Sequence, residues 1–184
     1  MRMTPMSIPD VLLLEPRVMT DERGHFLESW NAREFAALLG ASCEFVQDNH
    51  SCSHRGVLRG LHFQLERPQG KLVRVVGGRI FDVAVDLRRA SPTFGCWAGA
   101  ELSAENRRMM WVPPGFAHGF LALSGLADVL YKTTDYYHPA SERALRWDDP
   151  ALAIAWPLHE LDGGPLLSAR DRDAPGLDGL DIFP

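Results

Sequence analysis

Cysteine is scarce in this chain: its 184 residues include only Cys43, Cys52 and Cys96. Their odd number and the lack of a C-x-x-C spacing exclude a structural zinc ribbon and argue against a disulfide framework. Long apolar runs are also missing. No stretch approaches the roughly 18 apolar residues that a membrane-spanning helix requires, so we expect no membrane span.

Positive charge is in deficit, with 19 Lys and Arg against 24 Asp and Glu and a formal net charge of −5. This balance argues against a dedicated nucleic-acid binder. Residues 1–5 are not followed by the apolar core of a signal peptide, so we expect a cytoplasmic protein. The 46% apolar and 23% charged residues exclude a disordered or collagen-like chain. The length predicts a single domain over 1–184 with a sizeable core.

Thirteen prolines and sixteen glycines punctuate the chain into short segments, a rhythm typical of an all-β sandwich or barrel. Residues 79–87 alternate most regularly, with Ile80, Asp82 and Ala84 on one face and Phe81 and Val83 on the other. We expect strands over 11–14, 25–30, 45–47, 57–64, 71–76, 79–87, 97–102, 108–112, 118–122 and 129–134.

One helix is predicted over 31–39, because Asn31 can cap it, Glu34 stands at the capping-box position and Gly40 follows as a stop. Gly77 and Gly78 predict a hairpin turn. From Pro139 onward the chain is rich in Pro, Asp and Gly, which indicates an irregular tail with room for a short helix. The predicted fold is therefore a β-sandwich or barrel with a small outer helix.

Two histidines, His62 and His118, each lie close to glycines, where the backbone can approach a ligand. Either can equally be a hydrogen-bonded core histidine. Residues 113–118 read Pro-x-Gly-x-x-His, which resembles the second motif of metal-binding cupins. Such cupins also need a His-x-His pair, because alternate strand residues reach one ion. Gln64 stands where the second histidine would be, so we expect no metal.

Basic residues lie among the apolar strands: Arg59, Lys71 and Arg74, with Arg23 upstream. They form either a solvated face or a pocket for a phosphorylated ligand. On a regular strand Arg59 and His62 point to opposite faces. For both to enter one pocket the strand needs a bulge or a bend, which Gly60 can supply.

Tyrosines cluster at Tyr131, Tyr136 and Tyr137. Packing is their ordinary role, but a tyrosine that faces a histidine across a barrel places a general acid opposite a general base. By itself, Asp171 fits a helix cap or a surface charge.

Several runs of the sequence together resemble the dTDP-4-dehydrorhamnose 3,5-epimerase family. They extend over most of the chain in one order: VLRGLHFQ at 57–64, PQGKLVR at 68–74, DVAVDLR at 82–88, SPTFG at 91–95, PGFAHGF at 114–120, YKTTDYY at 131–137, WDDP at 147–150, IAWP at 154–157 and LSARD at 167–171.

The resemblance implies a double-stranded β-helix, or cupin-like jelly roll, without metal or other cofactor. It implies a homodimer that exchanges N-terminal strands and binds a dTDP-sugar. The catalytic base falls on His62, its orienting carboxylate on Asp171, the general acid on Tyr131, and the lysine near the keto oxygen on Lys71. Substrate contacts fall on Arg23, Glu28, Gln47, Asp48, Asn49, Arg59, His118, Glu142 and Arg170, and Tyr137 matches the tyrosine that stacks on thymine. Family members commonly have lysine where Arg170 stands, and an aromatic where His25 stands.

The chemistry suits these residue types, because protons on C3 and C5 of a 4-keto sugar are both α to the carbonyl. Their removal gives an enolate without any redox cofactor. Three alternatives remain: a mono-epimerase acting at C3 or C5 only, a keto-sugar isomerase, and a non-catalytic binder of nucleotide sugars. The set of His62, Asp171, Lys71 and Tyr131 favours an epimerase, but it does not separate one inversion from two.

Overall fold

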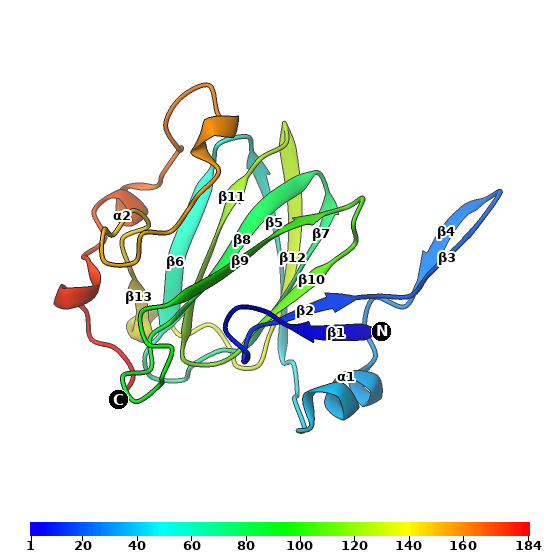
Figure 1. Cartoon of the computed structure of the whole chain (residues 1–184), viewed down its shortest axis with the longest axis horizontal. Coiled ribbons are helices and arrows are strands. Elements are labelled where there is room, and N and C mark those ends of the chain that lie inside the picture. The colour runs from blue at the N-terminus through cyan, green and yellow to red at the C-terminus, as the bar shows by residue number, and fades with distance from the viewer.

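Two facing β-sheets form the body of the protein in a computed structural model that describes residues 1–184 (Figure 1). The thirteen strands are β1 (Arg2–Pro5), β2 (Leu12–Glu15), β3 (Val18–Asp21), β4 (Gly24–Leu27), β5 (Gln47–His54), β6 (Leu58–Gln64), β7 (Lys71–Gly77), β8 (Arg79–Asp86), β9 (Trp97–Ser103), β10 (Met109–Val112), β11 (Phe116–Ala122), β12 (Leu126–Thr133) and β13 (Glu142–Ala144). The helices are α1 (Ala32–Leu39) and α2 (Ala169–Arg172), with 3₁₀ turns at Pro139–Ser141, Leu158–Glu160 and Leu177–Gly179.

The six-stranded sheet has the order β1-β2-β10-β7-β12-β5, and the five-stranded sheet has the order β13-β6-β11-β8-β9. All pairings within them are antiparallel. The facing sheets make a double-stranded β-helix, which confirms the cupin-like jelly roll expected from the resemblance.

Strand β8 shows how the sequence builds three layers. Ile80 and Ala84 share one face of the strand, as the alternation predicts, and this face joins the core between the sheets. Val83 and Val85 face outward and are covered by the C-terminal tail, including Trp156. Both outer-facing valines are fully buried, so the irregular tail closes this face of the sheet.

Helix α1 covers part of the outer face of the other sheet. Asn31 caps it by accepting hydrogen bonds from the backbone N–H groups of Arg33 and Glu34, and Gly40 ends it at φ +72°. This confirms the predicted start and stop. Phe35 is the buried anchor of the helix and packs edge-on against Trp111 of β10.

The predicted irregularity at Gly60 is present in β6. In the pairing with β11, His118 lies opposite His62 but Phe120 lies opposite Arg59, so β6 carries one extra residue. Gly60 has φ +120°, and a Cβ there would lie 2.6 Å from the Cα of Gly119. The bulge therefore needs glycine, and it turns Arg59 and His62 toward one cavity.

Several predicted bounds are wrong. The strand expected over 45–47 instead begins at Gln47 and runs to His54, because its alternate polar residues line a cavity rather than solvent. The strand expected over 25–30 ends at Leu27. Strands β1, β3 and β13 were not predicted. Each is only three or four residues long, which leaves little periodicity to detect.

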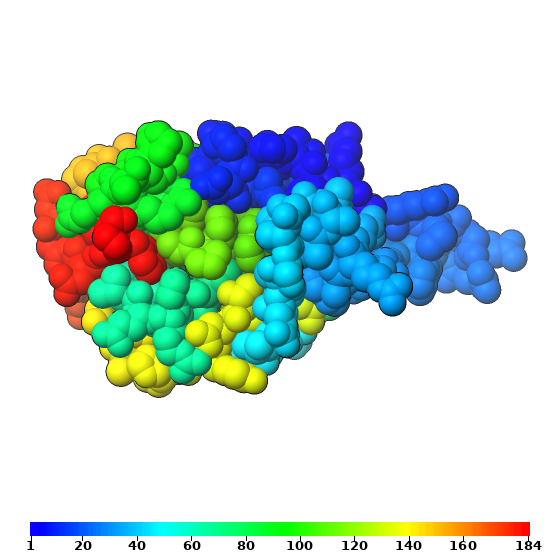
Figure 2. Space-filling view, turned by 90° about the horizontal axis from the view of Figure 1, so that it is seen from below, coloured from blue at the N-terminus to red at the C-terminus, as the bar shows by residue number.

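Strands β3 and β4 pair only with each other and form an arm that extends away from the body (Figures 1 and 2). Large apolar side chains on this arm are exposed, with Phe26 at 66% and Met19 at 48%. Such an arm lacks a partner within its own chain.

Candidate active site

A cavity opens between the two sheets as two adjoining hollows of about 220 and 260 Å³. His62, Lys71 and Tyr131 line both hollows. His62 comes from β6 in the five-stranded sheet, and Lys71 and Tyr131 come from β7 and β12 in the other. A ligand in this cavity would therefore lie between His62 and Tyr131.

His62 is held by a carboxylate from the tail. Its Nε2 lies 2.5 Å from Oδ1 of Asp171, and a carboxylate can only accept, so Nε2 carries the hydrogen. Nδ1 is then the ring nitrogen free to accept a proton. Burial opposes ionisation of Asp171, but its bonds to His62 and Ser168 outweigh burial and lower its pKa. The ionised partner favours an imidazolium whenever His62 takes up a proton.

The position of Asp171 follows from a local cap. Ser168 caps α2: its hydroxyl accepts from the backbone N–H of Asp171 and donates to Oδ2 of the same residue at 2.8 Å. Asp171 is 4% exposed, so the surface-charge interpretation is excluded. The Asp171 side chain lines the cavity and accepts the hydrogen bond from His62.

Lys71 is a buried cation beside these groups. Burial lowers its pKa from 10.5 to about 8, while the carboxylates of Asp82 and Glu142 oppose that fall. The ammonium donates to the carbonyl oxygen of His62 at 3.4 Å. At neutral pH the group is mostly protonated, and it places a positive charge in a buried part of the cavity.

Tyr131 presents its phenol from the sheet opposite His62. Burial raises its pKa, Glu142 adds to the rise, and Arg59 opposes it. The phenol is therefore protonated at neutral pH and can donate a hydrogen.

His118 forms a second histidine–carboxylate pair deeper in the cavity. Its Nε2 lies 2.7 Å from Oδ1 of Asp82, a fully buried residue whose Oδ2 has no partner. Sequence reasoning missed Asp82 as a site residue. The available signal was a carboxylate between two apolar residues, Ile80 and Ala84, on the inward face of β8.

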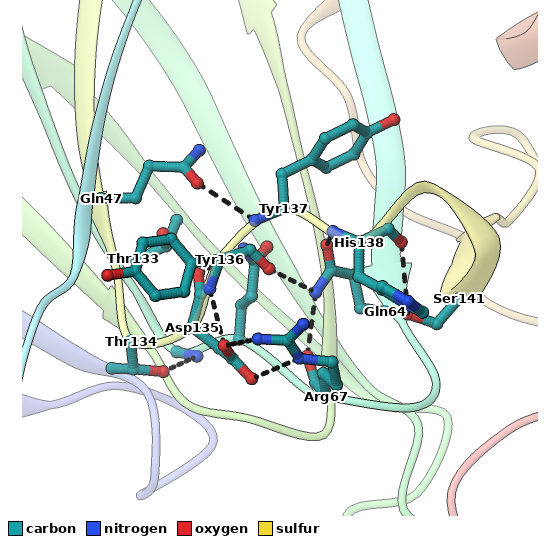
Figure 3. Close-up of polar contacts among 12 residues, drawn as sticks. Gln47, Gln64, Arg67, Thr133, Thr134, Asp135, Tyr136, Tyr137, His138 and Ser141 are labelled. Carbon is teal, nitrogen blue, oxygen red and sulfur yellow. Dashed lines mark hydrogen bonds and ion pairs between the residues drawn. The ribbon is translucent and has the colours of Figure 1, made fainter.

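The rim of the cavity is polar. Tyr137 donates its hydroxyl to Oε2 of Glu142 at 2.8 Å, and Arg170 donates to the same oxygen. Gln47 accepts from the backbone N–H of Tyr137 at 3.0 Å (Figure 3). It also donates to Oδ1 of Asn49 at 2.8 Å. Through these contacts, the rim residues predicted from the resemblance lie together at the opening of the cavity.

Four predicted or candidate residues lie away from this cavity. The side chain of Asp48 points to the opposite face of β5 and pairs with Lys132 at 2.8 Å. Arg23 lies in the arm, where it pairs with Asp21, and Glu28 follows the arm directly and accepts from Asn31. Arg74 lines separate hollows on the outer side of the sheet.

Ser51 and Gln64 also line the cavity, although the sequence singled out neither as a site residue. The Oγ atom of Ser51 is buried without a partner. No group of three or more His, Cys, Asp and Glu side chains is arranged to hold a metal ion. No helix is long and apolar enough to cross a membrane.

Comparison with known proteins gives consistent findings. Residues 5–179 match the family of dTDP-4-dehydrorhamnose 3,5-epimerase. The enzyme of that name from Pseudomonas aeruginosa is 57% identical over 184 residues, covering 100% of both chains. The dTDP-4-dehydrorhamnose 3-epimerase of Streptomyces niveus is 43% identical over 175 residues, 95% of this chain and 83% of that one.

Among solved structures, one is dTDP-6-deoxy-D-glucose-3,5-epimerase from Legionella pneumophila in complex with dTDP-4-keto-L-rhamnose. It aligns with a TM-score of 0.94 at 50% identity, over 98% of this chain and 94% of that one. Sequence and fold therefore agree over nearly the whole length.

Proposed function

The chain belongs to the dTDP-4-dehydrorhamnose 3,5-epimerase family, and on that premise we propose that it converts dTDP-4-dehydro-6-deoxy-D-glucose into dTDP-4-dehydro-L-rhamnose. The conversion inverts C3 and C5, the two carbons beside the C4 carbonyl. The observation that carries the proposal is the opposition of His62 and Tyr131 across one cavity beside the buried Lys71.

His62 acts as the base. Its free Nδ1 removes the proton from C3 or C5, and the electron pair moves through the carbonyl to form an enolate with its charge on O4. Asp171 holds the ring and stabilises the imidazolium that forms. The 2.5 Å contact between them supports this role.

Lys71 stabilises the enolate. Its ammonium stands in a buried site, where a fixed positive charge acts more strongly on O4 than it would in water. The pKa of about 8 leaves the group largely charged at neutral pH. No redox cofactor enters this chemistry, because electrons move only within the sugar.

Tyr131 completes each inversion. The base removes a proton from one face of the sugar, so inversion needs a proton delivered to the other face. The phenol comes from the opposite sheet and remains protonated, because burial raises its pKa. Asn49, Arg59, His118, Glu142 and Arg170 bind the substrate, and Tyr137 and Gln47 receive the nucleotide at the rim.

The protein acts as a homodimer in which each arm enters the neighbouring subunit. Support comes from the exposed Phe26 and Met19 and from the arm's lack of a partner in its own chain. Arg23 and Glu28, which lie away from their own cavity, would then reach the cavity of the second copy. Replacing Phe26 by glutamate should give a monomer of reduced activity in light scattering and turnover assays. An active monomer would contradict this arrangement.

The whole chain, 1–184, works as one epimerase domain, because the tail both covers the five-stranded sheet and supplies Asp171. We place the protein in the cytoplasm. Its three unpaired cysteines suit a reducing compartment.

Deuterium counting tests the reaction. The enzyme is incubated with dTDP-4-dehydro-6-deoxy-D-glucose in D2O, and the recovered sugar is analysed for label at C3 and C5. Label at both carbons is expected. Label at one carbon would favour the mono-epimerase, a candidate kept open by the 43% identity to the Streptomyces niveus 3-epimerase. Absence of label would favour a non-catalytic binder.

A further inference from the structure

The buried side-chain amide of Gln64 forms hydrogen bonds with the backbone on both sides of Tyr137. Gln64 is 4% exposed, and its Oε1 accepts from the N–H of His138 at 2.8 Å. Its Nε2 donates to the carbonyl oxygen of Tyr136 at 3.3 Å and to that of Arg67 at 2.9 Å (Figure 3). One side chain of β6 thus ties the residues flanking Tyr137 to the barrel.

The same residue also sets the partner of the Tyr137 hydroxyl. In the pairing of β13 with β6, Glu142 lies opposite Gln64. Oε2 of Glu142 accepts the Tyr137 hydroxyl at 2.8 Å. The backbone of Gln64 therefore positions Glu142, and the side chain of Gln64 positions the backbone around Tyr137. The Tyr137 side chain is thus held at its backbone and, through Glu142, at its hydroxyl.

Only a carboxamide satisfies this site. The three contacts require one acceptor and two donated hydrogens, which glutamine provides. Glutamate would keep the acceptor but turn a carboxylate oxygen toward two carbonyl oxygens. Methionine would fill a similar volume with no hydrogen bond at all. Because Gln64 is buried, the groups it leaves behind would lose their partners.

We propose that Gln64 is a positioning residue for nucleotide binding, which holds the ring of Tyr137 in the orientation that receives the thymine base. The inference rests on the proposed function, in which Tyr137 stacks on that base. It assigns a task to the side chain that stands where metal-binding cupins have their second histidine.

The first test measures binding of dTDP by calorimetry to the parent, Gln64→Glu and Gln64→Met. Two or three lost hydrogen bonds should weaken dTDP binding about 5- to 50-fold. KM should rise by the same factor while kcat changes less than about twofold, since the base binds alike in ground and transition states. Unchanged dTDP affinity in Gln64→Glu would overturn the proposal. So would a Gln64→Met variant that is unfolded at room temperature, because Gln64 would then serve the fold.

The second test is a double-mutant cycle with Tyr137→Ala. Loss of the ring should weaken dTDP binding about 5- to 150-fold, the range measured for stacking on a base. In that background Gln64→Glu should add less than about twofold, because the group it positions is absent. A full, independent loss in the double variant would show that Gln64 acts through something else.

Glu66→Gln is the matched control. Glu66 is exposed, lies two residues along the chain from Gln64 and makes no side-chain hydrogen bond or ion pair. This substitution should change dTDP affinity less than about twofold. The binding readout does not require turnover. If the parent binds dTDP but does not epimerise, the proposed function fails while Gln64 can still be judged.

Discussion

Replacing Lys71 by methionine should make the protein more stable and nearly inactive. Lys71 is 9% exposed, and burial lowers its pKa from 10.5 to about 8. A shift of this size corresponds to about 3 kcal/mol by which the ammonium destabilises the folded state relative to a neutral group. Methionine has similar length and no charge. At pH 7 the free energy of unfolding should therefore rise by about 2–3 kcal/mol, after about 1 kcal/mol for the lost hydrogen bond.

The direction of the effect of the Lys71 charge on stability can be tested by varying the pH. The folded pKa of Lys71 lies below the unfolded one, so between pH 8 and 10.5 the unfolded chain binds more protons. Parental stability should therefore rise with pH across this window, and the Met variant should lack that rise. Urea unfolding at pH 7 and 9.5, at one protein concentration, measures both. A Lys71→Met variant less stable than the parent at pH 7 would refute the reasoning. So would a difference in the free energy of unfolding between the two proteins that is no smaller at pH 9.5 than at pH 7. Turnover should fall about 10²- to 10³-fold, as for loss of an oxyanion donor.

Three further outcomes are expected. In a pH–rate profile, kcat/KM should fall as pH rises through about 8, because Lys71 loses the charge that stabilises the enolate. Burial opposes ionisation of Asp86, but bonds from Arg88, Ser91 and Thr93 outweigh it and lower its pKa to about 2. Asp86 should therefore contribute about 2 kcal/mol to the free energy of unfolding above pH 4, and this contribution should disappear toward pH 2. An acid titration of Asp86→Asn should not show this decrease. Phe35→Ala should reduce the free energy of unfolding by about 3–5 kcal/mol in urea titrations, because α1 loses its buried anchor.

Local physics made much of the fold predictable. The alternation in β8 placed Ile80 and Ala84 on one face of the strand and Val83 on the other, and Asn31 with Gly40 bounded the helix. Arg59 and His62 would point to opposite faces of a regular strand, so a shared pocket required a bulge or a bend between them, and the structure has the bulge. In each case a short stretch of sequence determines the outcome.

Contacts between distant segments were not predictable from single residues. Asp171 fits a cap or a surface charge when taken alone, and only the path of the tail places it against His62, 109 residues away. The pairing of His118 with Asp82 depends on the register of two strands. The hydrogen bonds from Gln64 to the backbone of 136–138 depend on the packing of a distant loop against β6. The resemblance identified most of the cavity residues, but it did not indicate Asp82 or Gln64.

The most direct test of the central claim compares two rates for Tyr131→Phe in one D2O reaction. With His62 intact and the phenol removed, the base still forms the enolate and the imidazolium can return a deuteron to the same face. The variant should exchange deuterium into recovered substrate faster than it forms epimer, and epimer formation should fall about 10²- to 10⁴-fold. His62→Asn should lose both exchange and product. If Tyr131→Phe epimerises as fast as the parent, the proton on the opposite face comes from another group, and the assignment of acid and base to facing sheets is wrong.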